Sequence, residues 1–421
     1  MSFNTIAVIG LGYIGLPTAA MFASKEKKVI GVDVNQHAVD TINRGQIHIV
    51  EPDLDIMVKN AVDRGFLKAT RSLEPADAFL IAVPTPFLPV KNKDSIPEPD
   101  LTFIETAAKS VAKVLKKGDL VVLESTSPVG TTEKMAIWLA EARSDLTFPQ
   151  TSGDNSDIRI AHCPERVLPG HVIRELVTND RVIGGMTEKC SKVAVELYNI
   201  FVEGDCFVTN ARTAEMAKLT ENASRDVSIA FANELSIICD KQGINVWELI
   251  ELANRHPRVN ILQPGPGVGG HCIAVDPWFI VSNNPTEAKL IQTARNVNNM
   301  KPEWVIKKVR EAINLHPNKS VKNILCLGLS FKPDIDDLRE SPAKFIVEAL
   351  VMERMGDIAI VEPNIDILPI SLRDNAVLSG LDNGLQVADI VVVLVKHKSF
   401  VENSIVLKSS QVLIDVCGLT R

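Results

Sequence analysis

The sequence predicts an α/β protein in which two doubly wound domains are joined by a helical middle domain that contains one long helix. Short β-branched runs alternate with helical patterns through residues 1–209, and the same alternation returns after residue 316. Between them, residues 213–242 keep helical spacing with neither glycine nor proline. We therefore expect three domains: 1–209, 210–315 and 316–421.

The two outer domains are expected to hold mainly parallel sheets, because strands that alternate with helices pair in parallel. In the first domain we expect strands at 5–9, 29–32, 78–83, 120–124, 159–163 and 180–183, with helices at 16–23, 103–114 and 132–141. In the last domain we expect strands at 323–328, 358–362, 390–395 and 412–416. These two domains form a loose pseudo-duplication, or they are unrelated; the residues alone leave both open.

The middle domain carries clear helix signals. Asn245 has Glu248 three residues later, which resembles a capping box and predicts a helix over 246–255. A loop rich in glycine and proline follows at 264–270. A further helical pattern covers 287–299, and Pro302 is expected to interrupt it.

Composition excludes several classes of protein. The chain is 46% hydrophobic and 23% charged with a net charge of −7, and no run of Lys and Arg resembles a nucleic-acid arm or a membrane-surface patch. No segment reaches the roughly 18 apolar residues of a membrane span, and the N-terminus lacks the pattern of a signal peptide. The seven scattered cysteines form no CxxC pair, which argues against a disulfide framework or a zinc site. We expect a cytoplasmic protein with no metal, nucleic-acid or membrane partner.

A glycine pattern predicts a dinucleotide site. The expected strand at 5–9 runs into Gly10, Gly12 and Gly15, which would make the tight turn, admit a pyrophosphate and let the helix pack closely. Asp33 ends the next strand, where a carboxylate binds the ribose 2′-hydroxyl and favours NAD over NADP. A purely structural glycine turn is the weaker alternative.

Two further loops follow strands at the same expected sheet edge, at 83–86 and 125–130. They are well placed to meet a cofactor, although such Ser/Thr/Pro loops are equally common as turns.

The middle domain offers a candidate nucleophile. Cys272 follows the glycine-rich loop, and Asp276 lies four residues later, one turn away if the segment is helical. On spacing alone, a buried hydrophobic cysteine is the commoner interpretation. Lys218, Asn222 and Arg225 would share one face of the long helix, where a solvated surface is again the commoner interpretation.

The motifs GLGYIG, VPTP, ESTSPVG, CPER, AEMAKLTEN, GVGGHCIAVDP and FKPDIDDLRESP occur in this order through all three expected domains. Together they resemble the UDP-sugar 6-dehydrogenases, and RHPRVN with GGHCIAVDPWF resembles the bacterial branch that acts on UDP-N-acetylhexosamines. His271 and Val275 stand where the UDP-glucose branch has serine and lysine, which argues against UDP-glucose as the substrate. His271 could be an acid–base group or a residue that shapes the substrate pocket.

The resemblance implies two Rossmann-like domains and a role for each motif residue. Cys272 would be the nucleophile, Lys218 and Asn222 would contact the reacting C6 oxygen, Asp276 would position water or accept protons, and Glu165 would assist thioester hydrolysis. The residues implied in NAD binding are Gly10, Gly12, Tyr13, Ile14, Gly15, Asp33, Thr85, Thr126 and Arg339. The residues implied in binding the UDP-sugar are Arg166, Val167, Leu168, Arg258, Gly267, Gly269, Phe331 and Lys332.

The expected reaction is the four-electron oxidation of UDP-N-acetyl-D-mannosamine at C6 to the uronic acid, with two NAD per sugar and a Cys272 thiohemiacetal and thioester. Its products would enter surface polysaccharides such as enterobacterial common antigen. Alternatives are UDP-N-acetylglucosamine, UDP-glucose or GDP-mannose as substrate, a two-electron hydroxyacid dehydrogenase, and a non-catalytic sensor. The resemblance also implies a homodimer or a dimer-based oligomer. The apolar face of the long helix, with Ala230, Phe231 and Ile237, would form the dimer contact or an internal core.

Overall fold

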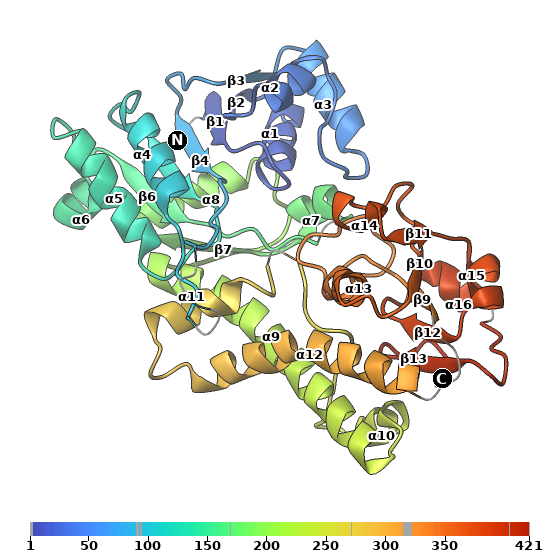
Figure 1. The fold of residues 1–421 in the computed structure, drawn as a ribbon. Helices are drawn as coiled ribbons and strands as arrows, with labels where there is room; N and C mark the ends of the chain where they lie inside the picture. The colour runs from blue at the N-terminus through green and yellow to red at the C-terminus, as the bar shows by residue number, and fades with distance from the viewer. Residues whose placement is uncertain are drawn as a thin grey trace. The chain divides into compact units, whose positions relative to one another are not determined.

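The computed structural model describes residues 3–420 apart from 90, 91, 93, 94, 169, 271, 315–321 and 404. The chain divides into two compact units, Met1–Thr220 with Trp278–Asn283 and Glu221–Pro277 with Asn284–Arg421. Each unit contains one sheet, and the predicted α/β class with a long helix is confirmed (Figure 1). The expected boundary at 315–316 lies outside the described residues.

The sheet of the first unit has eight strands in the order β3-β2-β1-β4-β5-β6-β7-β8, and all neighbours are parallel except β6 and β7. The strands are β1 (Thr5–Ile9), β2 (Lys28–Val32), β3 (Leu67–Thr70), β4 (Ala78–Ile81), β5 (Leu120–Leu123), β6 (Arg159–His162), β7 (Arg181–Gly185) and β8 (Cys206–Asn210). The six expected strands are all present. The two unexpected ones, β3 and β8, lie at the sheet edges, where half-exposed short strands lack a clear apolar pattern.

Helices cover both faces of this sheet. On β1, Ile6 and Val8 join one apolar cluster while Ala7 and Ile9 join another on the opposite face. The first face is covered by α1 (Gly15–Ser24), α2 (Gln36–Asn43), α3 (Leu54–Asp63), α7 (Val172–Thr178) and α8 (Glu188–Tyr198). The second is covered by α4 (Thr102–Ala112) and α5 (Thr131–Ala142), with the short α6 (Pro149–Ser152) following. The predicted doubly wound architecture is confirmed.

The sheet of the second unit has five parallel strands in the order β11-β10-β9-β12-β13. They are β9 (Asn323–Leu327), β10 (Asp357–Val361), β11 (Ala376–Leu378), β12 (Ile390–Val393) and β13 (Val412–Asp415). One face is covered by α12 (Lys289–Asn314), α13 (Pro342–Met352) and α14 (Ile370–Arg373), the other by α15 (Leu381–Val387) and α16 (Lys398–Glu402). By sequence order these strands repeat the arrangement β3-β2-β1-β4-β5, so the two sheets share one winding.

After β8 the chain forms α9 (Ala211–Gln242), α10 (Val246–Ala253) and α11 (Asp276–Asn283), and α12 follows them (Figure 1). The side chain of Asn245 accepts from the backbone N–H groups of Trp247 and Glu248, so the predicted helix start is confirmed. The predicted interruption at Pro302 is wrong, because α12 continues through it. Proline removes one helical hydrogen bond, but buried side chains on both sides, including Asn298 and Val305, hold the helix against its neighbours.

No helix among the described residues combines the length and apolar composition that crossing a bilayer requires.

A buried polar cluster lies where β5, β6 and β7 end or begin. The Arg181 guanidinium pairs with the Glu165 carboxylate at 2.8 Å and packs over the ring of Tyr198. The Tyr198 hydroxyl donates to Oε1 of Glu124 at 2.6 Å. Burial raises the pKa of Glu124 to about 7, although Tyr198 and the Arg181 charge oppose that rise. Near neutral pH the folded state therefore contains both the protonated and the ionised form of Glu124.

We expect this carboxyl to make the protein less stable as the pH rises. Its folded pKa lies above its unfolded value, so the folded state holds more protons, and that stabilisation is lost as the pH passes about 7. Between pH 5.5 and 8 the loss should be about 2 kcal/mol, and Glu124→Gln should remove it. Urea unfolding at the two pH values tests this, with the exposed Glu141→Gln as control. An equal pH dependence in the wild type and Glu124→Gln would contradict the assignment.

Candidate active site

The three glycines after β1 occupy positions that differ in what they permit. Gly10 has φ of +90°, and a Cβ there would lie 2.5 Å from the Ala82 carbonyl oxygen. A Cβ on Gly15 would lie 1.8 Å from the carbonyl oxygen of Gly10, whereas one on Gly12 would meet nothing within 4 Å. The turn is therefore tight at its first and third glycines and open at its second, as a pyrophosphate at the N-terminus of α1 requires. Tyr13 and Ile14 complete the turn.

Asp33 stands directly beside this turn. Its Oδ2 accepts from the backbone N–H of Leu11 at 2.8 Å, and its Oδ1 accepts from Asn35 at 2.8 Å. The residue is only half-buried, so the carboxylate remains within reach of a ligand.

His48 lies in the same region as Asp33, and the sequence analysis did not identify it. Its surroundings include Asp33 and the backbone of Leu11, and burial lowers its pKa although the Asp33 charge opposes this. Its Nδ1 is buried without a hydrogen-bond partner among the described residues. No glycine or strand pattern marks His48, and only its fold neighbours reveal it.

The loops after β4 and β5 meet, as their positions in the sheet predicted. The Ser125 hydroxyl donates to the carbonyl oxygen of Val83 at 2.7 Å and ties the two loops together. Thr85 Oγ1 in the first loop and Ser127 Oγ in the second are buried with no partner among the described residues, and Thr126, next to Ser127, is half-buried. Unsatisfied hydroxyls of this kind fit a site whose ligand supplies the missing partner.

The CPER segment (residues 163–166) is fixed by contacts within the first unit. Glu165 is buried in its ion pair with Arg181. Arg166 donates to the carbonyl oxygen of Asp180 at 3.3 Å, and the Leu168 backbone N–H donates to Glu175 at 2.7 Å. Val167 packs against the main apolar cluster and Leu168 is exposed. The structure therefore fixes this loop, while the predicted roles of Glu165, Arg166, Val167 and Leu168 stay predictions.

Helix α9 carries Lys218 and Asn222 one turn apart, both half-buried. Its first turns are fixed by Glu215, whose carboxylate accepts from the backbone N–H groups of Gly130 and Thr132 at 2.6 and 2.7 Å. These N–H groups belong to the start of α5, so Glu215 caps one helix from another.

Cys272 and Asp276 are joined by one helical turn. The Asp276 backbone N–H donates to the carbonyl oxygen of Cys272 at 2.8 Å, and α11 begins at Asp276. The Asp276 carboxylate is buried and accepts from Nδ2 of Asn222 at 2.5 Å. Of the seven cysteines, all within the described part of the chain, Cys272 alone is exposed. The alternative of a buried hydrophobic cysteine is therefore wrong for this residue.

The glycine-rich loop before Cys272 packs against residues 331–342 without room for side chains. A Cβ on Gly269 would lie 2.4 Å from the Glu340 carbonyl oxygen, and one on Gly270 would lie 2.9 Å from the ring of Phe331. Gly267, with φ of +144°, sits against Pro342. The structure thus brings together Gly267, Gly269 and Phe331, which the sequence assigned to the substrate.

A buried network of one ion pair and several hydrogen bonds also fixes this loop, and the sequence analysis did not predict it. Arg295 on α12 pairs with Asp226 on α9 at 2.6 Å, and both side chains are buried. Asn298 donates to Asp226 at 2.8 Å and accepts from Asn233 at 2.9 Å. The side-chain oxygen Oδ1 of Asn233 in turn accepts from the backbone N–H of Gly265 at 2.9 Å. The available signal was polar residues on the buried faces of both helices, at 226 and 233 and at 295 and 298.

The contacts described above do not include several of the predicted site residues. Arg339 is exposed and paired with Asp337 at 2.6 Å, and Arg258 is exposed in the turn after α10. Lys332 is half-buried beside Phe331. His271 lies outside the described residues.

Comparison with known proteins agrees with this geometry. Residues 4–202 match the NAD binding domain of the UDP-glucose/GDP-mannose dehydrogenase family, 212–300 its central domain and 325–421 its UDP binding domain. The chain is 65% identical to UDP-N-acetyl-D-mannosamine dehydrogenase of Campylobacter jejuni, over 95% of this chain and 97% of that one. It is 62% identical to NDP-N-acetyl-D-galactosaminuronic acid dehydrogenase of Ralstonia solanacearum, over 100% and 97%.

A solved structure, that of UDP-D-ManNAc dehydrogenase from Pyrococcus horikoshii, is also similar, with a TM-score of 0.86 and 39% identity over 99% of this chain and 96% of that one. The match of all three family domains in order, together with the dinucleotide turn and the exposed cysteine, leads to one conclusion: this chain belongs to the UDP-glucose/GDP-mannose dehydrogenase family of NAD-dependent enzymes.

Proposed function

We propose that this enzyme oxidises UDP-N-acetyl-D-mannosamine at C6 to UDP-N-acetyl-D-mannosaminuronic acid, with Cys272 as covalent nucleophile. The observation that carries the proposal is the exposed Cys272, which lies at the end of a glycine-rich loop packed on Phe331 and one turn before the buried Asp276. The relatives named for the mannosamine substrate support the choice of sugar.

A second candidate is the corresponding N-acetylgalactosamine nucleotide. The relative from Ralstonia solanacearum, whose name gives N-acetyl-D-galactosaminuronic acid, matches the whole chain at 62% identity. The two sugars differ in configuration around the ring, and both keep a primary alcohol at C6. The chemistry proposed for Cys272 therefore serves either one, and only the binding of the sugar ring separates them.

NAD is proposed to bind at the turn of Gly10, Gly12, Tyr13, Ile14 and Gly15, with Asp33 on the adenosine ribose. The turn leaves Gly12 open, Asp33 is half-exposed, and Thr85 has a buried hydroxyl without a partner among the described residues. Thr126 and Arg339 are proposed to assist. When bound, NAD takes a hydride from the sugar carbon, once in each of the two oxidation steps.

The catalytic residues are proposed to act in sequence. A base removes the C6 hydroxyl proton as the alcohol loses two electrons, and the thiolate of Cys272 then adds to the aldehyde carbon to form a thiohemiacetal. Loss of two more electrons gives a thioester, which water cleaves to the carboxylate and the free thiol. Lys218 and Asn222 are proposed to donate to the C6 oxygen, where one such donor contributes about 10²–10³ in rate.

Asp276 and Glu165 are proposed to handle protons and water in these steps. Asp276 is already held by Asn222, so its carboxylate has a fixed orientation. The UDP-sugar is proposed to contact Arg166, Val167, Leu168, Arg258, Gly267, Gly269, Phe331 and Lys332.

The domain division at 1–209, 210–315 and 316–421 is likewise a proposal, as is assembly into a dimer. Phe231 and Ile238 lie seven residues apart, on one stripe of α9, and are 51% and 44% exposed. Ala230 is buried and Ile237 half-buried within the chain itself. We propose that the exposed stripe covers the same stripe of a second copy.

The stoichiometry of the reaction tests the proposed chemistry. We expect two NADH per UDP-N-acetylmannosamine at completion, with little from UDP-glucose, because the thioester route carries the alcohol to the acid. Cys272→Ala should form no acid while its NAD dissociation constant stays unchanged. UDP-N-acetylgalactosamine and UDP-N-acetylglucosamine complete the panel and identify the sugar. One NADH per sugar, or acid formation by Cys272→Ala, would overturn the covalent mechanism.

The dinucleotide assignment is tested by Asp33→Asn. The loss of a charged hydrogen-bond acceptor for the ribose should weaken NAD binding by about 10- to 100-fold. The dissociation constant of NAD is measured by titration calorimetry, with Asp40→Asn on the exposed face of α2 as the matched control. A constant that is unchanged in Asp33→Asn would refute the assignment.

The dimer is tested by placing charges in the exposed stripe. Phe231→Glu with Ile238→Glu should shift the protein from dimer to monomer in analytical ultracentrifugation, because two carboxylates would face two others across the contact. Ile137→Glu, at a side chain of α5 with 47% exposure, is the control for adding charge elsewhere. A wild type that sediments as a monomer would contradict the proposal.

A further inference from the structure

We infer that His397 is a positioning residue for substrate binding: with Glu362 it fixes the segment 329–334, which presents Phe331 and Lys332 to the UDP group. The inference rests on the proposed function, in which this segment contacts the nucleotide.

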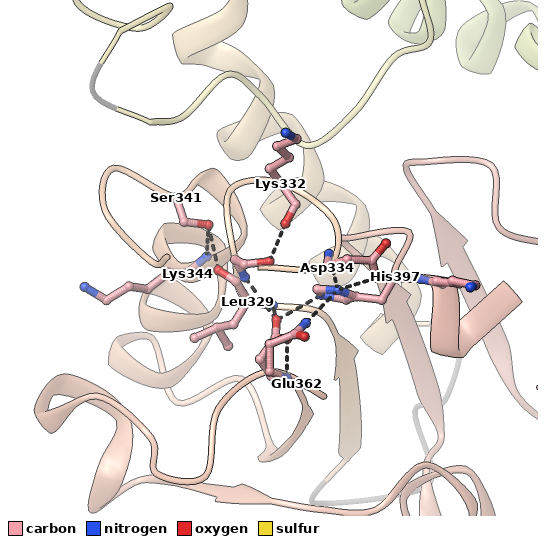
Figure 2. Close-up of polar contacts among 10 residues, drawn as sticks. Leu329, Lys332, Asp334, Ser341, Lys344, Glu362 and His397 are labelled. Atoms are coloured by element: carbon pink, nitrogen blue, oxygen red, sulfur yellow. Dashed lines mark hydrogen bonds and ion pairs between the residues drawn. The ribbon is translucent and has the colours of Figure 1, made fainter. Parts of the chain in front are cut away.

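The two residues form a buried pair: Glu362 directly follows β10, and His397 precedes α16 in the segment after β12. His397 Nε2 lies 3.0 Å from Glu362 Oε2, and both side chains are fully buried. The Asp334 backbone N–H donates to His397 Nδ1 at 3.0 Å, and Asn364 Nδ2 lies 3.1 Å from the same nitrogen. Figure 2 shows His397 between Glu362 and Asp334, with a bond to each.

These contacts define the state of the imidazole. Because Nδ1 accepts from a backbone N–H, the ring proton resides on Nε2 and is donated to Glu362. Burial by itself would raise the pKa of Glu362, but the bonds from His397, Leu329 and Ser330 outweigh it and lower that pKa. The imidazole of His397 and the carboxylate of Glu362 thus hold one segment from two sides.

Glu362 holds the start of the segment. Its Oε2 accepts from the backbone N–H groups of Leu329 at 2.7 Å and Ser330 at 3.1 Å. His397 holds the other end through Asp334, whose backbone is left-handed with φ of +62°. The Asp334 carboxylate also accepts from the backbone N–H of Lys398 at 2.8 Å. A non-glycine residue keeps this conformation where surrounding bonds enforce it.

The segment between the two anchors carries the predicted substrate residues. The carbonyl oxygen of Lys332 accepts from the Ser330 hydroxyl at 2.7 Å, so the Lys332 backbone is fixed. Its side chain extends away from the cluster in Figure 2, and it has no ion-pair partner within the described ranges of the chain. A lysine with a fixed backbone and an unpaired ammonium is suited to an anionic group such as a diphosphate.

The two sheets place an acid at equivalent positions, and the surroundings of the two acids differ. The N–H of Gly10 donates to Val32, and that of Gly328 donates to Val361, at 2.8 and 2.9 Å. Asp33 and Glu362 both accept from the residue after that glycine. Asp33 remains half-exposed, whereas Glu362 is covered by His397. In the first sheet the acid, Asp33, is proposed to bind a ribose. At the equivalent position of the second sheet, Glu362 instead holds the segment 329–334.

The test compares His397→Leu with His397→Asn, two variants of nearly equal size. Leu removes every hydrogen bond of the imidazole, including those with Glu362 and Asp334, whereas the Asn amide oxygen can still accept from the Asp334 N–H. We expect the dissociation constant of UDP to rise about tenfold in His397→Leu and distinctly less in His397→Asn. The dissociation constant of NAD should change less than twofold in both. Titration calorimetry measures both ligands, and Lys398→Ala is the control, since its side chain pairs with Glu402 away from the segment.

A further variant guards against misfolding. Asp334 is exposed, and glycine accepts its left-handed backbone, so Asp334→Gly should fold, keep NAD binding and weaken UDP binding severalfold through loss of the Lys398 contact. Equal UDP affinity in the wild type, His397→Leu and Asp334→Gly would overturn the inference alone. Failure of the wild type to bind UDP would overturn the proposed function and the inference with it.

Discussion

The buried ion pair between Asp226 and Arg295 is the interaction on which the position of the candidate nucleophile depends. It joins α9 to α12 in the interior of the second unit, and the amides of Asn298 and Asn233 extend it to the backbone of Gly265. Loss of either charge would leave the other buried without compensation, which typically costs about 3–5 kcal/mol. Since the loop that begins at Gly265 leads directly to Cys272, the contact that stabilises the helix pair also orients the candidate nucleophile.

A second constraint is the approach of backbone to backbone. Gly269 lies so close to Glu340, and Gly15 so close to Gly10, that no Cβ fits at either position. In each case the glycine allows close packing of a loop: the loop before Cys272 packs on residues 331–342, and the turn after β1 packs on itself and on Val8 of β1. At these positions glycine lets two backbone segments approach closely, and its flexibility is not what matters. The spacing of the glycines in the sequence was informative for this reason.

Features with local causes were predictable from the sequence. The strand at β1, the length of α9 and the cap at Asn245 each follow from residues close together in the chain. The edge strands β3, β8 and β11 were missed because short, partly exposed strands carry no strong pattern. The course of α12 through Pro302 was missed because packing outweighs the lost hydrogen bond. The residues of the candidate site also divide into those that local motifs mark and those that they do not. Motifs pointed to Cys272 and Asp33, while His48, His397 and Asp226 act through partners far away in the sequence, which no local pattern reveals.

The two sheets share one strand order, yet the fold alone does not determine whether the acid in each sheet can bind a ligand. Both place an acid at the end of the second strand of the winding, and both bond it to the backbone after the first strand. In the second sheet His397 covers that acid, so a ribose hydroxyl has no acceptor there. Under the proposed function, the two oxidations of one sugar then draw on the same dinucleotide site in turn. Such an exchange requires the half-oxidised carbon to stay bound while the cofactor is replaced, and a covalent bond to Cys272 meets that requirement.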